Sequence, residues 1–270
     1  MVESDKRFTG SIPDVYDAWL VPLIFETYAA DMARRVAALG PGDVLETAAG
    51  SGVVARALAP RLPEGARYVV SDLNPPMLRR GAARQPAGGR LHWQPADALD
   101  LPFGDASFDV VCCQFGAMFF PDRVAGHREA RRVLRPGGRY IFSVWDEIAA
   151  NGFADCVTLA LEEMFPDDPP RFLARVPHGY HDPDRVRADL AAAGFAEVTL
   201  ETVGGESRAG AARDPAIAYC QGTPLRSEIE ARGPAALAEA TDLAEARIAE
   251  RYGPGPVLAP IRAHVVSAGR

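Results

Sequence analysis

The sequence predicts an α/β protein built on a doubly wound, mostly parallel β-sheet. Two observations support this fold class. From Gly40 to Asp146, short strand-like runs alternate with helical patterns, and parallel strands require crossovers of this kind. The stretch ETAAGSGVVARAL, residues 46–58, places a glycine turn between the first strand-like run and the first helix. A turn of this kind is where α/β proteins usually hold a nucleotide.

Composition excludes several classes of protein. The chain has 270 residues, 48% hydrophobic and 24% charged, which suits one large globular domain or a core with an appendage. A net charge of −7 argues against nucleic acid as the main substrate. No apolar run approaches about 18 residues, and the first ten residues form no leader, so we expect a cytoplasmic protein without membrane insertion. The cysteines lack zinc spacing; Cys112 and Cys113 are expected to be buried, and no metal site is expected.

Five strands are expected in the first part of the chain: GDVLET, RYVVSD (67–72), LHWQPAD (91–97), FDVVCCQFG (108–116) and RYIFSVWD (139–146). The continuous apolar run at 108–116 indicates a strand buried on both faces. Proline and glycine mark the helices between the strands. Pro60 ends the first helix, Pro75 begins the second, and Gly137 follows the third, which starts at about Pro121. Strands separated by helices predict a Rossmann-like core.

The remaining sequence suggests a division into four regions: an N-terminal helical cap at 1–35, the core at 36–146, a helix and loop insertion at 147–181, and the last strands of the core at 182–270. A helix at about 152–165 and one capped by Asp182 and ended by Gly194 are expected. Residues 214–252 are predicted to be wholly helical and to form a lid. The segment IRAHVVSA (261–268) is predicted to return to a strand.

The glycine turn is compatible with two alternative nucleotide cofactors. Residues 50–55, GSGVVA, match the dinucleotide fingerprint GxGxxG/A. Asp72 lies 20 residues beyond Gly52, where a carboxylate that binds ribose hydroxyls is expected. This pattern alone would suit an NAD-dependent oxidoreductase. The Tyr-x-x-x-Lys pair of many such enzymes is absent, because Lys6 is the only lysine.

Further motifs point to another cofactor. Glu46 opens E-x-A-x-G-S-G at the end of the first strand, Asp97-Ala98 end the third, and RPGG at 135–138 leads into the fifth. In this combination and order the chain resembles the class I S-adenosylmethionine-dependent methyltransferases, especially the ubiquinone/menaquinone-biosynthesis C-methyltransferases, over roughly residues 10–146. The resemblance implies S-adenosylmethionine as cofactor, S-adenosylhomocysteine as product, a small and partly apolar methyl acceptor, and a final antiparallel strand.

The resemblance also assigns roles at the strand ends. Gly50 and Gly52 would let the chain pass close to the methionine part of the cofactor, and Glu46 would organise this loop or bind the amino group. Asp72 would accept both ribose hydroxyls through charge-assisted hydrogen bonds. The family usually has glycine at the position of Ala48. Alanine would cost little there if its φ is negative, but it would leave the loop tighter around the amino-acid end of the cofactor.

Six further residues are expected around the cofactor: Leu73 and Met77 beside the adenine, Asp97 with Ala98 at the adenine amino group, and Gln114 with Phe115 at the end of the fourth strand. Simple packing remains the alternative for Leu73, Met77 and Phe115. Tyr16 resembles an N-terminal tyrosine that closes over the cofactor in this group.

No catalytic residue is identified. The sulfonium is already activated, so the protein mainly has to align the acceptor and exclude water. A general base is needed only if the acceptor must lose a proton. His178, Tyr180 and His181 in VPHGYHDP are candidates, although a surface loop with a helix cap is the favoured interpretation of that segment. His127, on an arginine-rich helix, is expected to be solvated.

We therefore expect an S-adenosylmethionine-dependent methyltransferase. Two alternatives stay open: an NAD-dependent oxidoreductase, and a protein that binds the cofactor without transferring a methyl group. The expected partner is a small-molecule acceptor and not a nucleic acid, and a homodimer is left open. The sequence identifies neither the acceptor nor the atom that is methylated.

Overall fold

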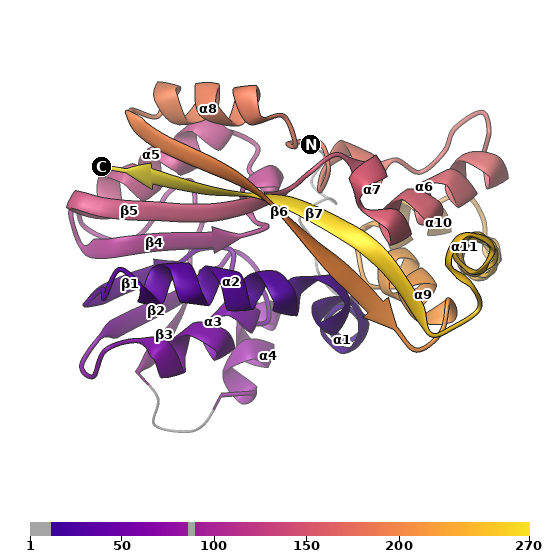
Figure 1. Cartoon of the computed structure of the whole chain (residues 1–270), viewed down its shortest axis with the longest axis horizontal. Coiled ribbons are helices and arrows are strands. Elements are labelled where there is room, and N and C mark those ends of the chain that lie inside the picture. Colours follow the sequence, from indigo (N-terminus) through magenta and orange to yellow (C-terminus); the bar gives the residue numbers. More distant parts are fainter. Residues whose placement is uncertain (1–11, 86–89) are drawn as a thin grey trace. The chain divides into compact units, whose positions relative to one another are not determined.

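A computed structural model describes residues 12–85 and 90–270, and within these ranges a seven-stranded sheet has the order β3-β2-β1-β4-β5-β7-β6 (Figure 1). The strands are β1 (Asp43–Glu46), β2 (Arg67–Asp72), β3 (Leu91–Pro95), β4 (Phe108–Gln114), β5 (Leu134–Trp145), β6 (Glu197–Ala209) and β7 (Val257–Gly269). The pairings β1–β2, β1–β4, β2–β3 and β4–β5 are parallel, and β7 runs antiparallel to its neighbours. The predicted doubly wound sheet with a final antiparallel strand is confirmed.

The chain divides into two compact units. The core unit comprises Glu26–Val144, Tyr180–Val203 and Ala263–Arg270. The helical unit comprises, within the described residues, 12–25, Trp145–Gly179 and Gly204–Arg262. Strands β5, β6 and β7 each run from one unit into the other.

Helices cover both faces of the sheet in the core unit (Figure 1). They are α2 (Glu26–Ala37), α3 (Val53–Leu58), α4 (Pro75–Ala83), α5 (Arg123–Val133) and α8 (Pro183–Ala192). Helices α2 and α3 pack on one face, where Met32 and Val54 join Ile141 of the sheet in a buried apolar cluster. Helices α5 and α8 pack on each other at the opposite face. The doubly wound arrangement follows from burying both faces of a parallel sheet.

Capping residues set several helix ends in the core unit. The Asp122 carboxylate accepts a hydrogen bond from the Ala125 N–H at the start of α5. Asp182 does the same for Asp184 at the start of α8, as predicted. Beyond the end of α8, Gly194 has φ of +94°, a left-handed conformation that glycine adopts without strain. The predicted start of α4 at Pro75 is confirmed.

His127 is fully buried, so the expectation that it is solvated is wrong. It lies on the stripe of α5 formed by Gly126, Ala130 and Val133, which faces the sheet, while the arginines occupy the other positions. Its Nε2 is 3.2 Å from the Tyr180 hydroxyl. Burial, assisted by the positive charge of Arg123, lowers the pKa of His127 to about 4, so the imidazole is neutral at pH 7.

The helical unit contains α1 (Ile12–Val15), the π-helical segment η2 (Tyr16–Phe25), α6 (Gly152–Met164), α7 (Phe172–Arg175), α9 (Arg213–Gln221), α10 (Leu225–Glu230) and α11 (Ala236–Tyr252). Short 3-10 turns are η3 (Ala59–Arg61) and η4 (Ala117–Phe119) in the core unit and η5 (Ile148–Ala150) in the helical unit. Residues 214–252 were predicted to be wholly helical, and they form the three helices α9, α10 and α11 with short non-helical turns between them. The Thr223 hydroxyl donates to the Tyr219 carbonyl and accepts from the Leu225 N–H, which ends α9 and begins α10.

Two further findings concern the described residues as a whole. No helix in the described ranges is long and apolar enough to cross a membrane. All four cysteines are buried and have free thiols, so the predicted burial of Cys112 and Cys113 is confirmed.

The buried imidazole generates a test of stability against pH. The folded-state pKa of His127 lies below its ordinary value. Its contribution to the free energy of unfolding is therefore complete above about pH 6.5 and is lost as the pH falls toward 4. His127→Phe should therefore unfold less steeply with acid than the wild type, while losing about 1 kcal/mol at pH 7 with the Tyr180 hydrogen bond. Urea titrations between pH 4 and 7 measure both effects. The exposed His92→Gln is the control, and equal acid sensitivity of wild type and His127→Phe would contradict the assignment.

Candidate cofactor-binding site

The glycine loop connects β1 to α3 at the carboxyl edge of the sheet. Three of its residues are left-handed: Ala48 at φ +52°, Gly50 at φ +56° and Gly52 at φ +75°. Backbone hydrogen bonds fix the loop to both neighbouring strands, because Thr47 N–H donates to the Cys112 carbonyl and Ala49 N–H to the Ser71 carbonyl, each at 2.9 Å. Gly50 and Gly52 adopt this left-handed conformation without strain, whereas other residues adopt it only at an energetic cost.

Asp72 ends β2 and binds the glycine loop directly. Its Oδ2 accepts the Gly50 N–H at 2.8 Å, and its Oδ1 accepts the Asn74 N–H at 2.7 Å. Burial raises the pKa of Asp72, and these hydrogen bonds oppose the rise. Oδ1 also accepts a longer hydrogen bond from the Asn74 side-chain amide at 3.3 Å, so Oδ2 keeps one lone pair for a ribose hydroxyl, and a second hydroxyl would have to replace that amide at Oδ1.

Glu46 ends β1 and is 1% exposed. The Tyr68 hydroxyl donates a hydrogen bond to its Oε2. Burial raises the pKa of Glu46 to about 8, and the nearby negative charge of Asp72 acts in the same direction, while the Tyr68 hydrogen bond and Arg56 oppose it. A cationic ligand beside this carboxyl group would favour its ionised form. Tyr68 was not singled out from the sequence; it lies opposite Val44 on β2, two positions before Val70, the residue that pairs with Glu46.

Ala48 does not meet the condition under which alanine would cost little at this position, because its φ is positive. At +52° an alanine is strained by about 1 kcal/mol or more relative to the right-handed region. Its methyl group fills the space beside Gly116, so that a Cβ added at Gly116 would overlap it and would also approach the Cys113 Sγ to 2.8 Å. Sequence reasoning missed Gly116; its signal was the glycine that ends the fourth strand-like run, FDVVCCQFG.

Phe115, next to Gly116, is a second strained residue at this edge, with φ of +53°. Its ring packs edge-on against Tyr28, with 5.3 Å between the ring centroids. Its N–H donates to the Ser143 carbonyl at 3.1 Å. Strained backbone at the ends of adjacent strands is typical of functional sites, where the surrounding structure holds it in place.

The other predicted cofactor residues of the core unit lie at the same edge, because parallel strands end there together. Leu73 is 49% exposed and Met77 is buried in the first turn of α4. Asp97 is exposed on the turn after β3, with half-buried Ala98 next to it, and half-buried Gln114 ends β4. The structure thus brings together every predicted cofactor residue except Tyr16.

Tyr16 lies in the helical unit, at the start of η2, so its predicted role stays a prediction. Its ring centroid is 5.3 Å from that of Phe25, which is 6.1 Å from Trp145. Trp145 in turn lies 6.1 Å from His178. These four side chains form a row of aromatic contacts inside the helical unit, which we call the aromatic row.

The three candidate bases have different surroundings. His178 is buried in the helical unit, with Nδ1 at 2.8 Å from the Asp146 carbonyl oxygen. A carbonyl can only accept, so Nδ1 carries the proton and Nε2 is the basic nitrogen of the neutral ring. Tyr180 is buried in the core unit, where burial raises its pKa, and is unsuited to proton transfer. His181 is exposed.

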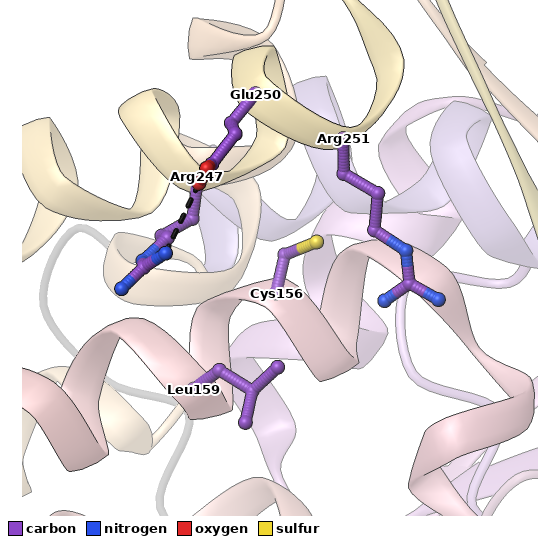
Figure 2. Close-up of a pocket in the computed structure, with 5 residues that line it drawn as sticks. All are labelled: Cys156, Leu159, Arg247, Glu250 and Arg251. Carbon is purple, nitrogen blue, oxygen red and sulfur yellow. Dashed lines mark hydrogen bonds and ion pairs between the residues drawn. The ribbon is translucent and has the colours of Figure 1, made fainter.

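A cavity of about 540 Å³ in the helical unit lies between α6 and α11 (Figure 2). Cys156, Leu159, Arg247, Glu250 and Arg251 line it. Both arginines have acidic partners, since Arg247 pairs with Glu163 and Glu250, and Arg251 pairs with Asp155 at 2.7 Å. Burial raises the pKa of the Cys156 thiol. These residues are not among the predicted cofactor residues, and the paired charges and protonated thiol do not mark this cavity as a reactive site.

Comparison with known proteins identifies the family. A family model described as a methyltransferase domain matches residues 45–142, which include the glycine loop, Asp72 and Asp97. The chain is 38% identical to a demethylmenaquinone methyltransferase of Deinococcus radiodurans over 137 residues, covering 50% of this chain and 56% of that protein. It is 32% identical to a demethylmenaquinone methyltransferase of Thermus thermophilus over 177 residues, covering 62% and 79%. The chain belongs to the S-adenosylmethionine-dependent methyltransferases.

A solved structure shares the methyltransferase fold at low identity. Phosphoethanolamine N-methyltransferase 2 of Haemonchus contortus, solved in complex with S-adenosyl-L-methionine, superposes with a TM-score of 0.63 at 17% identity, over 100% of this chain and 60% of that one. The chain spans about half the length of its Deinococcus relative.

The residues present fit the cofactor of this methyltransferase family. Glu46 and Asp72 are buried carboxyl groups at adjacent strand ends. S-adenosylmethionine carries a sulfonium and an ammonium against one carboxylate, so its net charge complements these groups. A dinucleotide would place a negatively charged diphosphate at the same loop, where neither carboxyl group offers it a compensating positive charge.

The buried carboxyl group of Glu46 predicts a second dependence on pH. Its folded-state pKa lies above its ordinary value, so its stabilisation is complete below about pH 4.5 and is lost as the pH rises through about 8. Glu46→Gln keeps an acceptor for Tyr68 and removes the ionisation. As the pH rises from 5 to 8, the free energy of unfolding of the variant should therefore increase relative to that of the wild type. Urea titrations at several pH values measure this difference. The exposed Glu64→Gln serves as control, and a constant difference across this range would count against the assignment.

The contact between Ala48 and Gly116 predicts a coupled pair of substitutions. Gly116→Ala should destabilise the protein by about 2 kcal/mol, because the added methyl group overlaps Ala48 and approaches Cys113. In the Ala48→Gly background the same substitution should cost less, because one of the two obstacles is gone. Gly104→Ala, where the added carbon would meet only the Ser107 hydroxyl at 3.6 Å, should be nearly neutral. Equal costs in both backgrounds would show that the methyl groups do not meet.

Proposed function

We propose that this protein transfers the methyl group of S-adenosylmethionine to a small, partly apolar acceptor and releases S-adenosylhomocysteine. The observation that carries the proposal is the pair of buried carboxyl groups, Glu46 and Asp72, on either side of a left-handed glycine loop. Family membership supports the same cofactor. The NAD-dependent alternative loses support, because the two buried carboxyl groups beside the loop supply no positive charge for a diphosphate.

The core unit supplies the groups for binding. Asp72 would accept the ribose hydroxyls while its bonds to Gly50 and Asn74 keep the carboxylate oriented. Glu46 would face the ammonium group, and Met77 would line the adenine together with Asp97. When bound, the cofactor supplies an activated methyl group on a sulfonium, so no metal is needed to make it reactive. The protein's main task is then alignment and exclusion of water.

The aromatic row supports an acceptor with a flat apolar part. Tyr16, Phe25 and Trp145 would contact such a ring, as aromatic side chains commonly do. Two relatives are named as demethylmenaquinone methyltransferases, and a quinone-like acceptor for this chain is part of the proposal. Where the acceptor must lose a proton, His178 Nε2 would take it, since the Asp146 carbonyl fixes the proton on Nδ1.

Calorimetric titration with S-adenosylmethionine, S-adenosylhomocysteine and NAD tests the cofactor. The wild type should bind the first two with micromolar Kd and should not bind NAD. Asp72→Asn should weaken both at least tenfold, because two charge-assisted hydrogen bonds of about 1.5–3 kcal/mol each are weakened. Asp122→Asn, which alters a helix cap of the core unit, should leave Kd unchanged. Binding of NAD in place of S-adenosylmethionine would overturn the proposal.

Turnover separates an enzyme from a protein that only binds. Incubation with labelled S-adenosylmethionine and a panel of hydroquinones, phenols and amines should yield methylated product from at least one flat apolar compound. Tight binding without transfer to any of them would favour the alternative of a binding protein without transfer activity.

A further inference from the structure

The indole ring of Trp93, on β3, lies in a slot between two glycines of the core unit. A Cβ placed on Gly52 would lie 2.5 Å from Trp93 Cη2, and one placed on Gly81 would lie 2.7 Å from both Cη2 and Cζ3. Real side chains do not approach this closely, so a larger residue at either position would have to displace the indole. Gly52 belongs to the glycine loop and Gly81 to α4.

Helix α4 also touches the loop itself, since the same Cβ on Gly81 would lie 3.1 Å from the Ser51 carbonyl carbon. Three segments of the candidate cofactor site therefore meet at one ring. The loop carries the left-handed turn, α4 carries Met77, and β3 leads to Asp97. The edge of the indole sets how closely these segments can approach one another.

Besides the indole, the Ser51 carbonyl carbon at 3.1 Å is the other group that a side chain at Gly81 would crowd. Gly81 lies inside α4 with an ordinary helical backbone, where alanine would stabilise the helix. Gly52 differs, because its left-handed φ of +75° already favours glycine. A substitution at Gly81 therefore tests the contact with the indole without adding the backbone strain that a substitution at Gly52 would cause.

We propose that Trp93 is a positioning residue for the cofactor: it sets the spacing between the glycine loop and α4, and through that spacing the affinity for the adenosine part of S-adenosylmethionine. The inference rests on the proposed function. Trp93 acts through Gly52 and Gly81 and takes no part in methyl transfer. Binding geometry is sensitive to displacements well below 1 Å, so a change in this spacing should be visible in Kd.

The test is a double-substitution cycle with Trp93→Phe and Gly81→Ala, followed by calorimetry with S-adenosylhomocysteine. Trp93→Phe removes the ring edge and should raise Kd at least tenfold. Gly81→Ala should also raise Kd and lower Tm, because its methyl group displaces the indole. In the Trp93→Phe background, Gly81→Ala should lower Tm less and raise Kd less than in the wild type, because the overlap with the indole is gone and only the approach to the Ser51 carbonyl carbon remains.

Two controls separate positioning from general loss of stability. Phe195→Leu removes a buried ring that packs against Tyr140 on the other face of the sheet, and should lower Tm without changing Kd. Tryptophan emission should change when the wild type binds S-adenosylhomocysteine, and most of this change should be absent in Trp93→Phe.

Two results would overturn the inference. A Kd within twofold of the wild type in folded Trp93→Phe would show that the ring does not set the affinity. An equal effect of Gly81→Ala in both backgrounds would show that the ring does not explain the glycine. If the wild type itself does not bind S-adenosylhomocysteine, the proposed function has failed, and this inference fails with it.

Discussion

The hydrogen bond from the Gly50 N–H to the Asp72 carboxylate is the interaction on which the candidate site depends. It joins the turn after β1 to the turn after β2, within a loop that is left-handed at Gly50. The second oxygen of Asp72 binds the Asn74 N–H and so fixes the start of α4. One carboxylate therefore determines the relative positions of the loop, the helix and the space between them.

This arrangement has an electrostatic cost. Two carboxyl groups are buried at adjacent strand ends, and burial raises the pKa of both. Without a ligand, Glu46 is stabilised mainly by the Tyr68 hydroxyl and by retaining its proton. A cation in the same space would relieve the cost for both groups. The site is therefore less stable by itself than it would be with a positively charged ligand, which is a common trade of stability for function.

Sequence reasoning recovered the strands, their order of appearance and the acids that end them, because apolar periodicity and proline or glycine punctuation are local signals. It failed where tertiary contacts decide. The sign of φ at Ala48 depends on how the loop meets β4, and the burial of His127 depends on which face of α5 meets the sheet. The slot around Trp93 joins residues from three segments, so no local pattern contains it. The helical stripe that includes Gly126 and Ala130 was the one signal that could have placed His127 correctly.

Strand β7 has a further consequence for how the protein is made. It lies between β5 and β6 in the sheet, although it is the last strand in the sequence. During synthesis the ribosome releases β5 and β6 first, and neither has its final neighbour until residues 257–269 have emerged. Until then, the core exposes open strand edges, which are prone to pair with other chains. The nascent protein thus keeps open strand edges until the end of its synthesis, for longer than the order of its first five strands would suggest.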